Sequence, residues 1–213
     1  MRINVAFTHV PLLALGPGRR VGVWFQGCSL RCPGCMSEEL WEHRETGWED
    51  VARVSAALLA AYGRESCCGV TVSGGEPLEQ ADALRELLCY LASGGVEDIL
   101  VYTGYTAAFV VRNFPWLVNT AGAMVSGPYR NARPTQCIWK GSANQRLTVF
   151  NPSLHERYQN WRMGEKRVAQ VLPLVAGVRV LGILAPGHLA ALGGRVIGNG
   201  DAQIGQEQRY GHG

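Results

Sequence analysis

The amino-acid sequence predicts an α/β fold in which strands and helices alternate and the strands run parallel. Short apolar runs that end in turn residues predict strands over residues 21–25, 70–73, 98–102 and 123–125. Apolar residues at helical spacing predict helices over residues 50–62, 81–91 and 106–113. In such sheets or barrels the functional groups gather at the carboxyl ends of the strands. The glycine-rich and cysteine-rich segments follow predicted strands, so a site is expected at that edge.

The length and composition are those of one globular domain. The chain has 213 residues, of which 47% are hydrophobic and 17% charged, and a chain of this kind buries a substantial core. The net charge of +3 is small and the basic residues are scattered, so neither nucleic acid nor a membrane is expected as a partner. The apolar patch over residues 10–15 is broken by Pro11 and fits neither a signal peptide nor a membrane anchor. A cytoplasmic location is therefore expected.

The strand and helix pattern weakens after Arg146. A strand is predicted over residues 178–184 and a short helix over 188–192, whereas residues 193–213 are rich in Gly and Gln and predict a disordered tail. The expected organisation is one domain over residues 1–192, which includes a C-terminal extension from about residue 147, followed by that tail.

A loop with three cysteines follows the first predicted strand. Cys28, Cys32 and Cys35 lie within eight residues, and the glycines and proline around them favour a tight curl. The seven cysteines of the chain are an odd number and suit a reducing compartment better than a disulfide framework. Structural zinc sites and electron-transfer [4Fe-4S] clusters usually have four protein ligands. Three thiolates therefore suggest a cluster with one iron left open for a substrate or cofactor.

The remaining cysteines and one histidine supply the alternatives. We interpret Cys67, Cys68, Cys89 and Cys137 as core or surface thiols, because adjacent cysteines cannot readily face one metal and the other two lie apart. His43 is the best candidate to complete a zinc site with the three loop cysteines, although its distance along the chain is not a common zinc spacing. A metal-binding module without catalytic turnover therefore stays an alternative.

Six short segments occur in an order that is typical of one group of enzymes. They are Gly16-Pro17-Gly18 with Arg19 or Arg20, Gly27-Cys28 through Cys32-Pro-Gly-Cys35, Trp41, Ser73-Gly-Gly-Glu-Pro-Leu78, Tyr102-Thr-Gly-Tyr105 and Trp139-Lys-Gly-Ser-Ala-Asn-Gln145. In this order they resemble the radical S-adenosylmethionine (SAM) superfamily, and within it the activating proteins of anaerobic ribonucleotide reductases. The resemblance implies a partial (βα)-repeat barrel of parallel strands with the cluster loop after the first strand.

The resemblance also implies the cofactors and the site residues. The three cysteines would hold a [4Fe-4S] cluster whose fourth iron is chelated by the amino and carboxylate groups of SAM. One electron then cleaves SAM to methionine and a 5'-deoxyadenosyl radical, which abstracts a hydrogen atom. Because the cofactors carry this chemistry, no side chain is predicted to be catalytic by itself. The residues expected at the SAM or substrate side are Ser73, Gly74, Gly75, Glu76, Thr103, Gly104, Ser142, Asn144 and Gln145.

Two hypotheses about the target follow from the resemblance. In the first, the chain is an activase that forms a glycyl radical in a partner enzyme and receives its electron from a low-potential donor such as flavodoxin or ferredoxin. In the second, it is a stand-alone radical SAM enzyme that modifies a peptide or small molecule. Both require the same cluster and the same SAM site.

Overall fold

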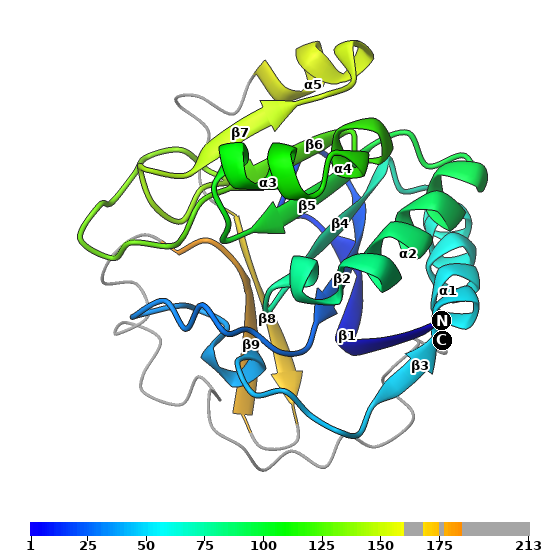
Figure 1. The fold of residues 1–213 in the computed structure, drawn as a ribbon, viewed down its shortest axis with the longest axis horizontal. Helices are drawn as coiled ribbons and strands as arrows, with labels where there is room; N and C mark the ends of the chain where they lie inside the picture. The colour runs from blue at the N-terminus through cyan, green and yellow to red at the C-terminus, as the bar shows by residue number, and fades with distance from the viewer. Residues whose placement is uncertain (160–167, 175–176, 185–213) are drawn as a thin grey trace.

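A seven-stranded sheet forms the centre of the computed structural model, which describes residues 1–159, 168–174 and 177–184. The strands lie in the order β3-β1-β2-β4-β5-β6-β7, and β8 and β9 form a separate antiparallel hairpin. The strands are β1 (Arg2–Leu12), β2 (Arg20–Phe25), β3 (Trp48–Asp50), β4 (Gly69–Gly74), β5 (Ile99–Thr103), β6 (Ala123–Ser126), β7 (Arg146–Val149), β8 (Ala169–Leu174) and β9 (Gly177–Gly182). Figure 1 shows the arrangement.

Five α-helices and three short 3-10 helices connect the described strands. The α-helices are α1 (Val51–Arg64), α2 (Ala81–Ser93), α3 (Ala107–Asn113), α4 (Trp116–Thr120) and α5 (His155–Gln159). The 3-10 helices are η1 (Glu38–Leu40), η2 (Pro77–Gln80) and η3 (Pro152–Leu154). Asp50 and Thr106 cap α1 and α3 by accepting hydrogen bonds from backbone N–H groups, which explains why both helices begin where polar residues precede an apolar pattern.

The four central strands are parallel, as the sequence predicts. β2 pairs with β4, β4 with β5 and β5 with β6, all in parallel register. Helices α1 and α2 cover one face of these strands and share a core with them, in which Leu58, Leu84 and Leu88 are fully or almost fully buried. The α/β fold with parallel strands and a cysteine loop after the first of them is therefore confirmed.

The edges of the sheet were not predicted. Residues 2–12 form a long strand that pairs antiparallel with β2 and with β3, whereas the sequence indicates only a short apolar patch there. β1 shows no strict alternation of buried and exposed residues along its length, so periodicity does not reveal it. β7 closes the other edge antiparallel to β6, and it includes residue 147, where the sequence pattern begins to weaken.

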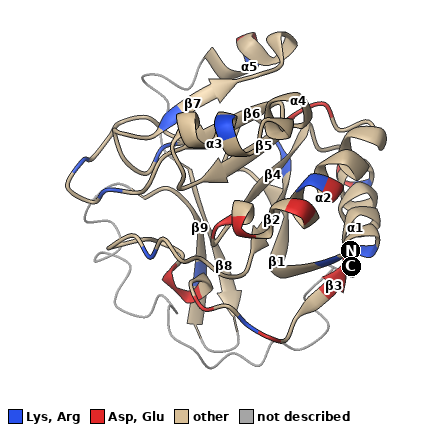
Figure 2. Ribbon diagram, viewed as in Figure 1, with Lys and Arg blue, Asp and Glu red and all other residues tan. Residues whose placement is uncertain are grey.

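The C-terminal region is only partly described. The predicted strand over 178–184 corresponds to β9, and its partner β8 was not predicted. The predicted helix over 188–192 and the predicted tail over 193–213 lie outside the described residues. Among the described residues, no helix combines the length and apolar character that crossing a membrane requires. Over all the described residues, Lys and Arg are spread over helices, strands and loops rather than collected in one element (Figure 2).

A buried polar network lies at the amino ends of the parallel strands. Arg20 and Asp98 have fully buried side chains and form an ion pair at 2.9 Å. Arg20 also donates to Thr71 Oγ1 at 2.7 Å, and Tyr158 Oη donates to Asp98 Oδ1 at 2.7 Å. Burial alone would raise the pKa of Asp98, but Arg20 and these hydrogen bonds hold it below its usual value. The network joins β2, β4, the residue before β5 and α5.

Removing parts of this network should lower the stability of the fold in a graded way. Tyr158→Phe removes one hydrogen bond to a carboxylate and should reduce the free energy of unfolding by about 1–3 kcal/mol. Asp98→Asn leaves the buried Arg20 without a counter-charge and should cost about 3–5 kcal/mol. Urea unfolding of the reduced chain measures both, with the half-exposed Tyr90 as the control, because Tyr90→Phe should change stability by less than about 0.5 kcal/mol. Equal losses for Tyr158→Phe and Tyr90→Phe would contradict the role of the network.

Candidate functional site

The cysteine loop is fixed to the end of β2 by backbone hydrogen bonds. Gly27 N–H donates to the Leu40 carbonyl at 2.8 Å and Cys28 N–H to the Trp41 carbonyl at 2.9 Å. A turn in which Cys35 N–H donates to the Cys32 carbonyl at 3.0 Å brings the last two cysteines back together. The start of the loop is thus bonded to the end of η1, and the turn holds Cys35 near Cys32.

The glycine pair at the end of β4 packs directly against this loop. Gly75 N–H donates to the Phe25 carbonyl and Glu76 N–H to the Gly27 carbonyl, both at 2.8 Å. A Cβ at Gly74 would overlap the backbone of Phe25, and one at Gly75 would overlap the Gly27 carbonyl. Gly74 also has a φ of +119°, which favours glycine. The two glycines are therefore required for the cysteine loop to lie against β4.

Glu76 joins the ends of two strands from a buried position. Its carboxylate accepts hydrogen bonds from Thr103 Oγ1 at 2.8 Å, from Gly104 N–H at 2.7 Å and from Leu78 N–H at 3.0 Å. Burial raises the pKa of Glu76 to about 7, and the three hydrogen bonds act in the opposite direction. The structure brings the predicted residues Glu76, Thr103 and Gly104 together, and they form hydrogen bonds with one another.

Two further predicted residues stabilise the loop after β6. Ser142 is buried and its Oγ accepts a hydrogen bond from Arg130 N–H at 3.1 Å. Asn144 Nδ2 donates to the Pro128 carbonyl at 2.7 Å, while its Oδ1 is buried and has no hydrogen-bond partner among the described residues. Both side chains thus hold the loop after β6, and one amide oxygen is left to accept a further donor.

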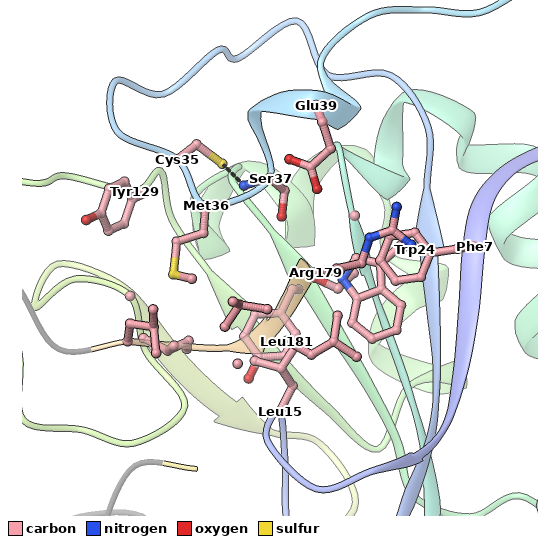
Figure 3. Close-up of a pocket in the computed structure, with 18 of the residues that line it drawn as sticks. Phe7, Leu15, Trp24, Cys35, Met36, Ser37, Glu39, Tyr129, Arg179 and Leu181 are labelled. Carbon is pink, nitrogen blue, oxygen red and sulfur yellow. Dashed lines mark hydrogen bonds between the residues drawn. The ribbon is translucent and has the colours of Figure 1, made fainter. Parts of the chain in front are cut away.

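A cavity lies over the carboxyl ends of the strands and beside the cysteine loop (Figure 3). Of the predicted residues, Cys35, Ser73, Gly74 and Gln145 line it, and the others do not. Its remaining lining residues are Phe7, Leu15, Trp24, Met36, Ser37, Glu39, Tyr102, Tyr129, Gly141 and residues 179–184. Among them, Phe7 and residues 179–182 come from β1 and β9, and they were not predicted because no local pattern links those strands to the cysteine loop.

The three loop cysteines have the chemistry that an iron-sulfur cluster requires. All are free thiols, with Cys28 buried and the other two half-buried. Burial raises the pKa of the Cys35 thiol to about 11, so bound iron would supply the charge that keeps it a thiolate. The indole Nε1 of Trp41 is buried and has no partner at full hydrogen-bond geometry in the described part of the chain, but it lies close enough to the Cys35 thiol to act toward lowering the pKa of that thiol. A cluster-bound sulfur fits this vacant donor.

The structure gives no support to a zinc site completed by His43. His43 Nε2 lies 3.2 Å from Glu79 Oε2 and 3.3 Å from Ser29 Oγ. Within residues 1–159, 168–174 and 177–184, no group of three His, Cys, Asp or Glu side chains is arranged to hold a single metal ion. A four-iron cluster keeps its three thiolates farther apart than a single ion does, so this finding is compatible with the predicted cluster.

The other four cysteines belong to different parts of the fold. Cys67 is buried and Cys68 Sγ contacts the Pro17 carbonyl at 3.4 Å, at the amino ends of the strands. Cys89 is exposed on α2 and Cys137 lies in the long loop before β7. None of them lines the cavity.

Substitution of Gly75 should disturb the cysteine loop selectively. Gly75→Ala forces the Gly27 carbonyl away and should reduce the free energy of unfolding by about 1–3 kcal/mol, together with a fall in iron and sulfide bound after reconstitution. Gly63 in α1 is the matched control, because no atom lies within 4 Å of an added Cβ. Gly63→Ala should leave iron content unchanged and stabilise the chain by about 0.5–1 kcal/mol. Normal iron content in Gly75→Ala would show that the glycine does not support the loop.

Comparison with known proteins identifies relatives over this part of the chain. A family profile described as a 4Fe-4S single cluster domain matches residues 14–148. The anaerobic ribonucleoside-triphosphate reductase-activating protein of Enterobacteria phage T4 is 28% identical over 135 residues, which cover 62% of this chain and 85% of that protein. The corresponding protein of Escherichia coli K12 is 27% identical over 136 residues, covering 61% of this chain and 88% of the relative.

Two further matches are shorter or more distant. The pyruvate formate-lyase-activating enzyme of Listeria monocytogenes is 42% identical over 88 residues, which cover 40% of this chain and 35% of that enzyme. Among solved structures, QueE from Escherichia coli matches with a TM-score of 0.40 and 21% identity, over 50% of this chain and 54% of QueE.

The family profile and the matched activating proteins confirm the resemblance to radical SAM activating proteins, and with it the enzyme class and the cofactor pair of a [4Fe-4S] cluster and SAM. The cysteine loop, both glycines and the loop after β6 all fall inside the matched residues. The profile covers well over half of the sequence, and the chain belongs to the 4Fe-4S single cluster domain family.

Proposed function

We propose that this chain activates a partner enzyme by forming a glycyl radical in it. The observation that carries the proposal is the position of the three free cysteines, which lie at the carboxyl end of β2 against the Gly74-Gly75 end of β4. When bound, the cluster and SAM supply a 5'-deoxyadenosyl radical, which removes a hydrogen atom from the target. Every other part of the function rests on how the chain positions these groups and what it allows near them.

The residues of the proposed site have two tasks: some would hold the cluster and SAM, and others would exclude water. Cys28, Cys32 and Cys35 would hold three irons of the cluster. Ser73 and Gly74 line the cavity at the end of β4, where the missing side chain of glycine lets SAM approach the backbone. Of these five residues, Cys35, Ser73 and Gly74 line the cavity itself.

Apolar groups also line the cavity. Leu15 and Trp24 are almost completely buried and belong to one hydrophobic cluster, which keeps water from a reactive radical. Met36 lies directly after the last cysteine and faces the same space (Figure 3). The residues proposed for SAM through the resemblance, Gly75, Glu76, Thr103, Gly104, Ser142 and Asn144, would act here mainly by holding the loops that carry the site.

The expected partners follow from the relatives. The proteins of phage T4 and Listeria are named as activators of an anaerobic reductase and of a formate-lyase, which supports a glycyl radical enzyme as the target of this chain. A low-potential protein such as flavodoxin or ferredoxin would supply the electron. The seven cysteines are all free thiols, which supports a reducing compartment and hence the cytoplasm.

One observation favours the second function, a stand-alone enzyme that acts on a peptide or small molecule. The β8–β9 hairpin lies beyond the residues matched by the family profile, yet residues 179–184 line the cavity. A target protein would have to reach the radical beside this added wall. A smaller substrate would meet no such obstacle.

Loss of any loop cysteine should abolish the reaction. The reconstituted chain is reduced with dithionite in the presence of SAM, and 5'-deoxyadenosine is measured. Cys28→Ser, Cys32→Ser and Cys35→Ser should each lower its formation more than about 100-fold, beyond the 10- to 100-fold loss typical of removing an outer partner of a ligand. Cys89→Ser, on the exposed face of α2, should behave as the unmodified chain. Equal losses in all four variants would refute the three-ligand assignment.

The target is tested with the glycyl radical enzymes encoded in the same genome. Each candidate is incubated anaerobically with the reconstituted chain, SAM and reductant, and electron paramagnetic resonance is used to detect a glycyl radical. A radical that appears only with the active chain, and not with Cys32→Ser, supports the activase. Formation of 5'-deoxyadenosine without a radical in any candidate rejects it and favours the stand-alone enzyme.

A further inference from the structure

The β8–β9 hairpin is fixed against the inner side of the sheet. Leu181 is 3% exposed and packs in one cluster with Leu12 and Trp24. Gln170 connects the hairpin to β1, because its Nε2 donates to the Pro11 carbonyl at 2.8 Å and its Oε1 accepts from Leu13 N–H at 2.7 Å. The hairpin is therefore packed against the sheet and forms one wall of the cavity.

Arg179 is the cationic residue that this wall adds to the cavity. Its guanidinium carbon lies 3.9 Å from the centroid of the Phe7 ring, and Phe7 stacks on Trp24 with 4.5 Å between ring centroids. Stacking on an aromatic face fixes the plane of a guanidinium and leaves the N–H groups at its edge available. Arg179 is thus held in place by its face (Figure 3).

The guanidinium forms no ion pair in the described part of the chain, although the charge of Glu39 acts on it from across the cavity. No carboxylate there lies within 4.0 Å of it, although Glu39 lines the same cavity. Burial is the main influence on the pKa of both groups: it lowers the pKa of Arg179 and raises that of Glu39. The charge of each group opposes the effect of burial on the other but does not cancel it. A half-buried arginine in a cavity without an ion-pair partner is a ready site for an anion.

We propose that Arg179 binds a carboxylate group of a molecule that occupies this cavity. The cavity also contains Cys35, Ser73 and Gly74, so that molecule lies beside the proposed cluster and SAM site. Arg179 is then a binding residue that β9 brings to this site. The inference rests on the proposed function only in the identity of the occupant, which is either the hydrogen donor or SAM itself.

The test measures binding and does not depend on turnover. The reconstituted full-length chain is titrated calorimetrically, up to 50 mM, with N-acetylglycine and with N-acetylglycinamide, which differ only in the carboxylate. The unmodified chain should bind the acid about 10- to 100-fold more tightly than the amide. Arg179→Gln should remove this preference, and Arg179→Lys should restore part of it because the charge is kept. Arg112, exposed near the end of α3, is the control, and Arg112→Gln should retain the full preference.

A second titration with SAM distinguishes the source of the carboxylate. Unchanged SAM affinity in Arg179→Gln assigns the subsite to the hydrogen donor. A loss of about tenfold or more in SAM affinity, with N-acetylglycine competing against SAM, assigns it to the carboxylate of SAM. The inference is overturned if the unmodified chain does not prefer the acid, or if Arg179→Gln changes neither titration. Absence of 5'-deoxyadenosine formation would instead count against the proposed function, because both titrations proceed without it.

Discussion

The buried ion pair between Arg20 and Asp98 aligns the parallel strands on which the site depends. Arg20 begins β2, donates to the Val70 carbonyl of β4 at 2.8 Å and pairs with Asp98 directly before β5. In the resulting register Arg20 lies opposite Gly69 and Phe25 lies opposite Gly74. The alignment that the charges fix at the amino ends is thus the alignment that places the cysteine loop against the glycine pair at the carboxyl ends.

A buried pair of this kind stabilises a fold only when its remaining hydrogen-bonding capacity is used. Arg20 donates to Thr71, to two backbone carbonyls of the neighbouring strands and to both oxygens of Asp98. Tyr158 and Arg157 donate further hydrogen bonds to the Asp98 carboxylate. Because both of these residues come from α5, the segment after β7 is tied to the same network. The amino end of the sheet is accordingly a saturated polar core.

The carboxyl end of the sheet differs in this respect. Buried polar atoms are normally paired in folded proteins, yet Trp41 Nε1 beside the cysteine loop and Asn144 Oδ1 in the loop after β6 have no partner among the described residues. A third such atom, Thr148 Oγ1 in β7, lies opposite Met124 and therefore away from the carboxyl end. Arg179 adds a cation to the cavity that forms no ion pair with any carboxylate in the described part of the chain. Donors and acceptors left open at one end of a sheet, with a saturated network at the other, indicate where bound groups belong.

The parts of the fold that the sequence predicts are those whose signals are local. The helices α1 and α2 carry apolar stripes, and the central strands are short apolar runs, so both appear in the periodicity of the chain. β1, β3 and β7 owe their existence to antiparallel pairing with distant strands, which no local window contains. The same distinction applies to the site. The cysteine loop and the glycine pair are compact motifs, whereas Phe7 and Arg179 meet only in the folded chain. Glu76 is intermediate, because its motif is evident but its bonds to Thr103 and Gly104 are not.

The residues that match the relatives and the residues beyond them contribute different parts of the site. The matched residues 14–148 contain every cysteine of the loop and both glycines, so the proposed cluster site lies in the part that the relatives share. β9 lies outside that part and contributes a continuous run of cavity residues. Since Gln170 and Leu181 tie the hairpin to β1 and to the core, displacing it would break two hydrogen bonds and expose an apolar cluster. An occupant of the cavity therefore has to fit against the hairpin as it stands, and the residues that contact it include some beyond the shared domain.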